Sequence, residues 1–158
     1  MTYLVQETCT VSGTRTRDTA PRSPRAPLLL VVEDGTRLSD ALAGLCDFLR
    51  ISVEAVGAED DLAQELRRRR PMAVLTEMDG AVQDGCYVMM RIAEYDRALP
   101  VMLLTGTSPP LIGAAEAVQE LCQLTEVSRC AVLPEIGEIV EFLFQAGRSG
   151  SCLGLVPI

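Results

Sequence analysis

Acidic side chains that could bind a metal ion stand at the ends of two short apolar runs. Glu33 and Asp34 follow the first run, Glu77 closes the second, and Asp79 comes two positions after it. Thr105, at the end of a third run, would add a hydroxyl group. Carboxylate oxygens suit a hard divalent ion such as Mg²⁺, and acids gathered without an evident cation attract one. Acids this close either raise a carboxyl pKa or bind a metal ion, and a Mg²⁺ site formed by Glu33, Asp34 and Glu77, beside Asp79 and Thr105, is the hypothesis for the second case, with no other cofactor expected.

These side chains meet only if the apolar runs are parallel strands of one sheet. Runs typical of buried strands occupy residues 28–32, 52–56, 72–76, 100–105 and 130–133. Apolar residues at helical spacing follow each run, within residues 38–49, 62–70, 88–95, 110–124 and 136–144. Five strands alternating with five helices predict an α/β doubly wound parallel sheet. Because ligands bind beyond the carboxyl ends of such strands, we expect Glu33, Asp34, Glu77, Thr105 and Leu133 around one crevice.

The chain has 158 residues, which is enough for one domain with its own core. Residues 1–26 are rich in Thr, Ser, Arg and Pro and predict a flexible tail. We expect the folded domain at 27–147 and a C-terminal tail at 148–158, with no output domain after it. No apolar run has the length of a membrane span, and no secretory signal is evident. We therefore expect a cytoplasmic protein without a membrane partner.

Missing residue types exclude several classes of enzyme. The chain has no His and no Lys, and all 14 basic residues are arginines. This excludes Ser-His-Asp catalysis, Schiff bases and a P-loop lysine, so we expect a protein that is not an enzyme. Residues 1–26 carry four arginines against Glu7 and Asp18, which leaves a net charge of −10 on the remaining 132 residues. So acidic a domain argues against nucleic acid as a partner.

Six cysteines show no metal-binding spacing, and we expect them to be reduced core residues. Four consecutive arginines, residues 67–70, end the second predicted helix. A nucleic-acid patch is one interpretation of them. We favour the other, that they are solvated cations complementing the carboxyl end of the helix.

The order and spacing of these motifs resemble the response-regulator receiver (CheY-like) family over about residues 27–146. The resemblance is carried by residues 30–34 before a helix, 71–77 with Asp84-Gly85, 100–105 and 132–134. The position of Glu77, eight residues before Gly85, is the most specific feature. The resemblance implies a flavodoxin-like fold with five strands and five helices, and a role in two-component or phosphorelay signal transduction.

Some positions match the functional residues of that family. There, two acids after the first strand help to hold Mg²⁺, and Glu33 and Asp34 stand at these positions. A Ser or Thr that ends the fourth strand contacts the phosphate, and Thr105 matches it. An aspartate that ends the third strand accepts a phosphoryl group from a histidine kinase, and Glu77 occupies that place.

Two further positions depart from the family. Leu133 replaces a lysine that pairs with the phosphate, and Cys130 stands where an aromatic residue near the start of the fifth strand reorients on activation. Phosphoryl transfer depends on positioned positive charge, and a glutamate reaches about one bond too far. We therefore predict a single-domain pseudo-receiver that acts through protein contacts, largely without phosphorylation. Asp79 is a weak candidate for a replacement acceptor.

Glu77 itself has two interpretations. It could imitate a phosphorylated aspartate, or it could be a vestige of lost chemistry. A glutamate supplies one negative charge where a phosphate supplies nearly two, and Leu133 cannot pair with it. We favour the vestige.

The helix at 110–124 is almost free of charge and predicts an interface. Receiver-like proteins use this helix, the fifth strand and the last helix to contact targets or one another. The expected partner is a histidine kinase, a downstream regulator or a second copy of the chain. The alternative function is a Mg²⁺-dependent phosphotransfer or nuclease-type enzyme that uses Glu33, Glu77 and Asp79.

Overall fold

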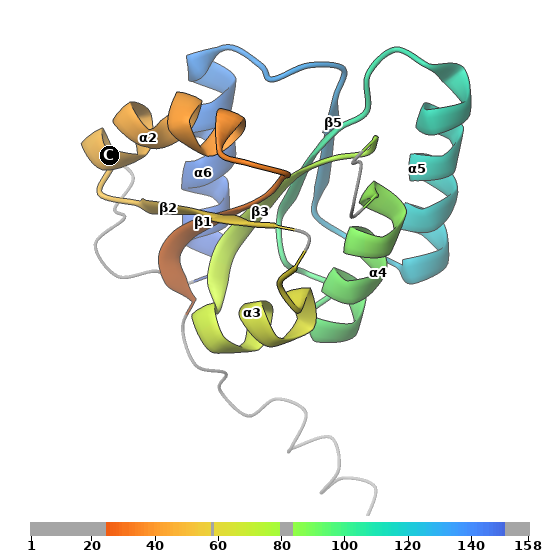
Figure 1. Ribbon diagram of the computed structural model, residues 1–158, viewed down its shortest axis with the longest axis horizontal. Coiled ribbons are helices and arrows are strands. Elements are labelled where there is room, and N and C mark those ends of the chain that lie inside the picture. Colours follow the sequence, from red (N-terminus) through yellow and green to blue (C-terminus); the bar gives the residue numbers. More distant parts are fainter. Residues whose placement is uncertain (1–24, 58, 80–83, 151–158) are drawn as a thin grey trace, which may run out of the picture.

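The computed structural model describes residues 25–57, 59–79 and 84–150 (Figure 1). Its strands pair in parallel in one sheet, in the order β2-β1-β3-β4-β5. Their bounds are β1 Ala26–Val32, β2 Ser52–Val56, β3 Pro71–Glu77, β4 Val101–Leu104 and β5 Val127–Cys130. The helices are α2 Arg37–Phe48, α3 Leu62–Arg69, α4 Gly85–Tyr95, α5 Pro109–Cys122 and α6 Ile136–Gly150. The predicted doubly wound α/β fold is confirmed.

Helices cover both faces of the sheet, which explains why its inner strands are apolar throughout. Leu29 and Val31 of β1 pack in the core under α2 and α6, whereas Leu30 and Val32 pack under α3, α4 and α5 (Figure 1). Side chains of a strand alternate between faces, so a strand buried on both sides needs a continuous apolar run. None of the described helices is both long and apolar enough to span a bilayer.

The connections that follow β1 and β3 lead to helices on opposite faces of the sheet. Helix α2 follows β1 on one face, and α4 follows β3 on the other. This is the topological switch point, where doubly wound sheets bind their ligands. The fold therefore places the ends of β1 and β3 at the expected crevice.

The fifth strand was predicted wrongly at 130–133. It is Val127–Cys130, paired with β4 from Val101↔Val127 to Leu104↔Cys130. Because β5 is an edge strand, its side chains are exposed or half-buried, so the strand carries no continuous apolar run. The apolar residues that suggested a strand lie after it, and Val132 is 72% exposed.

Both ends of the domain extend beyond the predicted boundaries. Strand β1 begins at Ala26, and Arg25 forms an ion pair with Asp96, so both residues belong to the fold and not to a tail. Helix α6 continues past position 147 to Gly150. The predicted tails otherwise fall on residues 1–24 and 151–158, which lie outside the described residues.

Gly85 explains the fixed spacing to Glu77. The first residue of α4 is buried, and its N–H donates to the Met78 carbonyl at 3.0 Å. A Cβ atom at this position would lie 2.7 Å from the Cα of Met78, a backbone atom that cannot swing away. Glycine is therefore required where α4 begins against the end of β3.

Replacing Gly85 with alanine is expected to lower the free energy of unfolding by about 1–3 kcal/mol, because β3 and α4 must separate. Gly113 in α5 is the matched control, since a Cβ there meets no atom within 4 Å. Gly113→Ala should raise stability by about 0.5–1 kcal/mol through helix propensity. Urea denaturation of both variants tests the contrast, and equal changes would contradict the close approach.

Candidate functional site

Glu33 caps helix α2. Its side chain is 9% exposed, and its two oxygens accept hydrogen bonds from the backbone N–H groups of Leu38 and Ser39, each at 2.8 Å. The N-cap residue Thr36 makes no side-chain cap bond to the helix, so Glu33 satisfies N–H groups that would otherwise lack partners. Its negative charge also complements the positive end of the helix. Both carboxylate oxygens are therefore engaged in holding α2 in place.

Asp34, the second predicted metal-side acid, is exposed. It does not line the cavity that surrounds Glu77, and neither does Glu33. The two acids after β1 thus differ in role and surroundings, although they are adjacent in the sequence.

Glu77 ends β3 and is paired with an arginine. Nη2 of Arg37, the first residue of α2, donates to Glu77 Oε2 at 3.1 Å. The expectation that no cation lies near these acids is therefore wrong, because the β1–α2 connection carries Arg37 across the switch point. The two residues are 40 positions apart in the sequence, and only the topology joins them. The position of Arg37 at the start of the helix after β1 was the available signal.

The Arg37–Glu77 pair is weak and balances the charge of Glu77 alone, since Asp79 also lines the cavity. The side chains are 72% and 38% exposed, so water screens the pair and its contribution stays under about 1 kcal/mol. The positively charged guanidinium of Arg37 nevertheless lies beside Glu77, the predicted acceptor position. The carboxylate of Glu77 is not the unpaired anion that the sequence suggested.

A cavity of about 450 Å³ opens at this end of the sheet. It brings together four predicted positions, Glu77, Asp79, Thr105 and Leu133, and adds Arg37 to them. Its remaining lining comes from neighbouring residues of α2, the β4–α5 loop, α5 and the segment after β5. The predicted crevice therefore exists, with a different set of charges around it.

Thr105 turns its hydroxyl toward the backbone. The side chain is 6% exposed, and Oγ1 donates to the Gly106 carbonyl at 2.9 Å, with the Cys130 carbonyl at 3.4 Å. The backbone N–H of Thr105 also donates to the Cys130 carbonyl, at 2.8 Å. The backbone N–H of Thr105 thus holds the start of the β4–α5 loop to β5, and its hydroxyl lies within hydrogen-bonding distance of backbone carbonyls.

The positions that replace the lysine and the aromatic residue carry no equivalent group. Leu133 is half-buried and packs against the core under α2 and α6, as does Cys130. Cys130 is the last residue of β5 and not near its start, because the strand begins earlier than predicted. Burial, and secondarily the charge of Glu138, raise the pKa of the Cys130 thiol. A thiol of raised pKa and an aliphatic side chain therefore occupy the two predicted positions.

Among the described residues, the three acids predicted to bind Mg²⁺ do not form one cluster of ligands. Within 25–57, 59–79 and 84–150, no three acidic or cysteine side chains are grouped so that they could hold a metal. The predicted set of Glu33, Asp34 and Glu77 is not brought together, because the Glu33 oxygens bind α2 and Glu77 pairs with Arg37. The guanidinium group meets the electrostatic need that suggested a metal ion.

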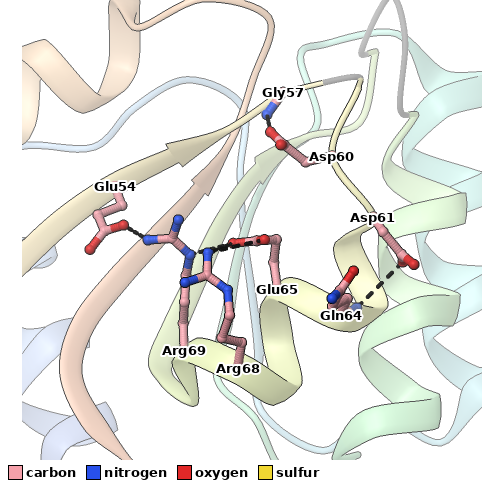
Figure 2. Close-up of polar contacts among 8 residues, drawn as sticks. All are labelled: Glu54, Gly57, Asp60, Asp61, Gln64, Glu65, Arg68 and Arg69. Atoms are coloured by element: carbon pink, nitrogen blue, oxygen red, sulfur yellow. Dashed lines mark hydrogen bonds and ion pairs between the residues drawn. The ribbon is translucent and has the colours of Figure 1, made fainter.

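The arginines at the end of α3 are largely engaged within the domain (Figure 2). Arg68 donates to Glu65 at 2.8 Å, and Arg69 pairs with both Glu65 and Glu54 of β2. Arg70 is the left-handed C-cap of the helix, with a φ of 47°. These cations complement the carboxyl end of α3, as the favoured interpretation predicted, and two of the four are neutralised by glutamates.

Comparison with known proteins gives structural matches only. The sequence matches no protein-family model and no curated protein. A response-regulator receiver domain protein from Clostridium thermocellum is similar in structure, with a TM-score of 0.61 and 18% identity, over 78% of this chain and 96% of that one.

Two further structures show the same fold. The receiver domain of a sensor histidine kinase from Pseudomonas aeruginosa, with magnesium in its active-site cleft, has a TM-score of 0.54 and 23% identity, over 76% of this chain and 96% of that one. NtrX from Brucella abortus matches with a TM-score of 0.58 and 19% identity over 78% of this chain, which spans only 27% of NtrX. This chain therefore has the fold of response-regulator receiver domains.

Proposed function

We propose that this chain is an atypical receiver, a pseudo-receiver that works in two-component signalling in the cytoplasm by protein contact and largely without phosphorylation. The observation that carries the proposal is the ion pair between Arg37 and Glu77 at the phosphoacceptor position. The similarity of the fold to receiver domains supports the signalling class.

Three features of the cavity support a receiver that is not phosphorylated in the ordinary way. The reaction needs a nucleophile at the right distance, a metal ion or cations on the transferring group, and an unhindered approach. Here the acceptor position carries a glutamate already paired with Arg37, and Leu133 supplies no charge. The Thr105 hydroxyl, which would contact the phosphate, donates to the backbone.

The same geometry argues against Glu77 as a phosphate mimic. Its single negative charge is balanced by the guanidinium of Arg37 at 3.1 Å. A phosphoryl group at this site would instead bring nearly two negative charges. The crevice therefore presents a neutral pair, which supports the interpretation of Glu77 as a vestige.

The contact surface that we propose is formed by α5, β5 and α6. Ala115 is the only residue of α5 that is fully buried, although the helix is mainly apolar. Leu121 of α5 is 81% exposed, and Ile136 at the start of α6 is 66% exposed. Apolar side chains in these positions favour a protein partner. A histidine kinase, a downstream regulator or a second copy of the chain fits this surface.

Affinity capture from the native host tests the proposal. Partners recovered with the wild-type chain should be lost with Leu121→Asp and retained with Glu77→Ala. Phe48→Asp is the matched control, because Phe48 is 82% exposed but lies on α2. Loss of the same partners with Glu77→Ala, and their retention with Leu121→Asp, would contradict the proposal.

A further inference from the structure

A groove of about 470 Å³ runs between the edge of the sheet and α6, away from the Glu77 cavity. Met102 of β4 and Phe142 and Ala146 of α6 line its apolar part. Three exposed glutamates also line it, Glu126 before β5 and Glu138 and Glu141 on α6. The groove thus combines apolar contact area with negative charge.

The three glutamates are available for a cation from outside the described residues. None of them forms an ion pair with any arginine in the part of the chain that the structure describes. Other glutamates of the domain, such as Glu65 and Glu116, do pair with arginines. An occupant of this groove should therefore be basic, with some apolar side chains.

We propose that the groove binds the N-terminal segment of this same chain, residues 1–24. The segment carries Arg15, Arg17 and Arg22 against Glu7 and Asp18, a net charge of +1 from its side chains, together with apolar residues near its start. It offers one arginine for each glutamate of the groove. The other segment outside the structure, residues 151–158, contains no basic residue. Charge complementarity therefore selects the N-terminal segment over the C-terminal one.

A chain of hydrogen bonds connects the point at which this segment joins the fold to the groove. Arg25 Nη2 is bonded to Asp96 at 2.7 Å, and the carbonyl of the next residue, Arg97, accepts from the backbone N–H of Thr125 at 3.1 Å. Thr125 lines the groove. A segment of 24 residues spans up to about 80 Å when extended, so it reaches the full length of the groove.

The contact is expected to be moderate in strength and sensitive to salt. Exposed arginine–glutamate pairs are individually weak, and salt screens them. Because the segment is tethered, its effective concentration near the groove is high. Together these effects give a closed state about five times as populated as the open one at low ionic strength. The contact does not depend on the proposed signalling function, and no partner protein enters its test.

The rate of limited proteolysis by trypsin measures this contact in the chain of 158 residues. The protease cuts only after arginine here, since the chain contains no lysine. When opening is fast, the cleavage rate follows the open population, so docking should slow cleavage after Arg15 and Arg17 about six-fold. The triple variant Glu126→Gln, Glu138→Gln, Glu141→Gln should lose this protection. The control triple variant Glu59→Gln, Glu120→Gln, Glu135→Gln changes the net charge equally, at exposed positions outside the groove, and should keep it.

Peptide mass spectrometry at low salt gives the two cleavage rates, and circular dichroism checks that both variants are folded. Faster cleavage of the groove variant than of the control variant, with a difference that disappears at high salt, supports the proposal. Equal rates for the two variants would overturn it. Protection that increases with protein concentration would assign the segment to a neighbouring copy and would overturn it as well.

Discussion

Arg25→Ala is expected to lower the free energy of unfolding by about 1.5–3 kcal/mol, the range for a hydrogen bond to a charged group. The guanidinium of Arg25 lies 2.7 Å from Asp96 Oδ2, and the two side chains are only 13% and 12% exposed. Asp96 also accepts a hydrogen bond from the Ala98 N–H, so its carboxylate is fixed at the end of α4. Removing the arginine takes a charged hydrogen-bond donor away from a carboxylate that is mostly shielded from water, which costs more than the loss of an exposed pair.

Urea denaturation measures the effect, with Arg148→Ala as the control. Arg148 is exposed and bonds only to Gln145 on its own helix, so its removal should change stability by less than about 0.5 kcal/mol. The double variant Arg25→Ala, Asp96→Ala should lose less free energy of unfolding than the sum of the losses of the two single variants, because the residues act as a pair. A loss below about 1 kcal/mol for Arg25→Ala would show that the pair is solvated.

The second large effect is expected at Glu33. Glu33→Ala removes two hydrogen bonds to the start of α2 and one charge from the positive end of the helix. Hydrogen bonds to charged groups and caps of this kind together give a loss of about 2–4 kcal/mol. The N–H groups of Leu38 and Ser39 would be left buried, since both residues are inaccessible.

Asp34→Ala is the control for Glu33→Ala, because Asp34 is the adjacent acid and is exposed. Its replacement should change the free energy of unfolding by no more than about 0.5 kcal/mol. Thermal or urea unfolding without added metal separates the two variants. Similar small losses for both would mean that Glu33 does not cap α2. A Mg²⁺-dependent stabilisation of the wild type that both variants lose would restore the predicted metal pair.

The sequence predicted the inner strands well because burial on both faces leaves an unbroken apolar run. Residues 28–32 and 72–76 lie within β1 and β3 for this reason. The same rule failed for β5, where an edge strand has half-exposed side chains and a more apolar segment follows it. Edge strands carry a weaker pattern, so their position follows from pairing with β4 and not from composition.

The candidate site was predicted in position but not in charge. Topology placed Glu77, Thr105 and Leu133 at one cavity, but Glu33 and Asp34, which the same rule placed there, do not line it. Which partner each side chain binds depends on rotamers and loop paths that periodicity does not report. Glu33 therefore caps a helix where the pattern suggested a metal ligand. Arg37, a residue that the motifs did not include, pairs with Glu77.

Phosphorylation of the purified chain tests the central claim most directly. The wild-type protein is incubated with acetyl phosphate and Mg²⁺ beside a phosphorylation-competent receiver domain, and both are analysed by intact-mass spectrometry. We expect a phosphoryl adduct on the competent domain and none on this chain, because Arg37 pairs with Glu77 and Leu133 supplies no cation. A phosphoryl adduct on the wild type that disappears in Glu77→Ala or Asp79→Ala would contradict it.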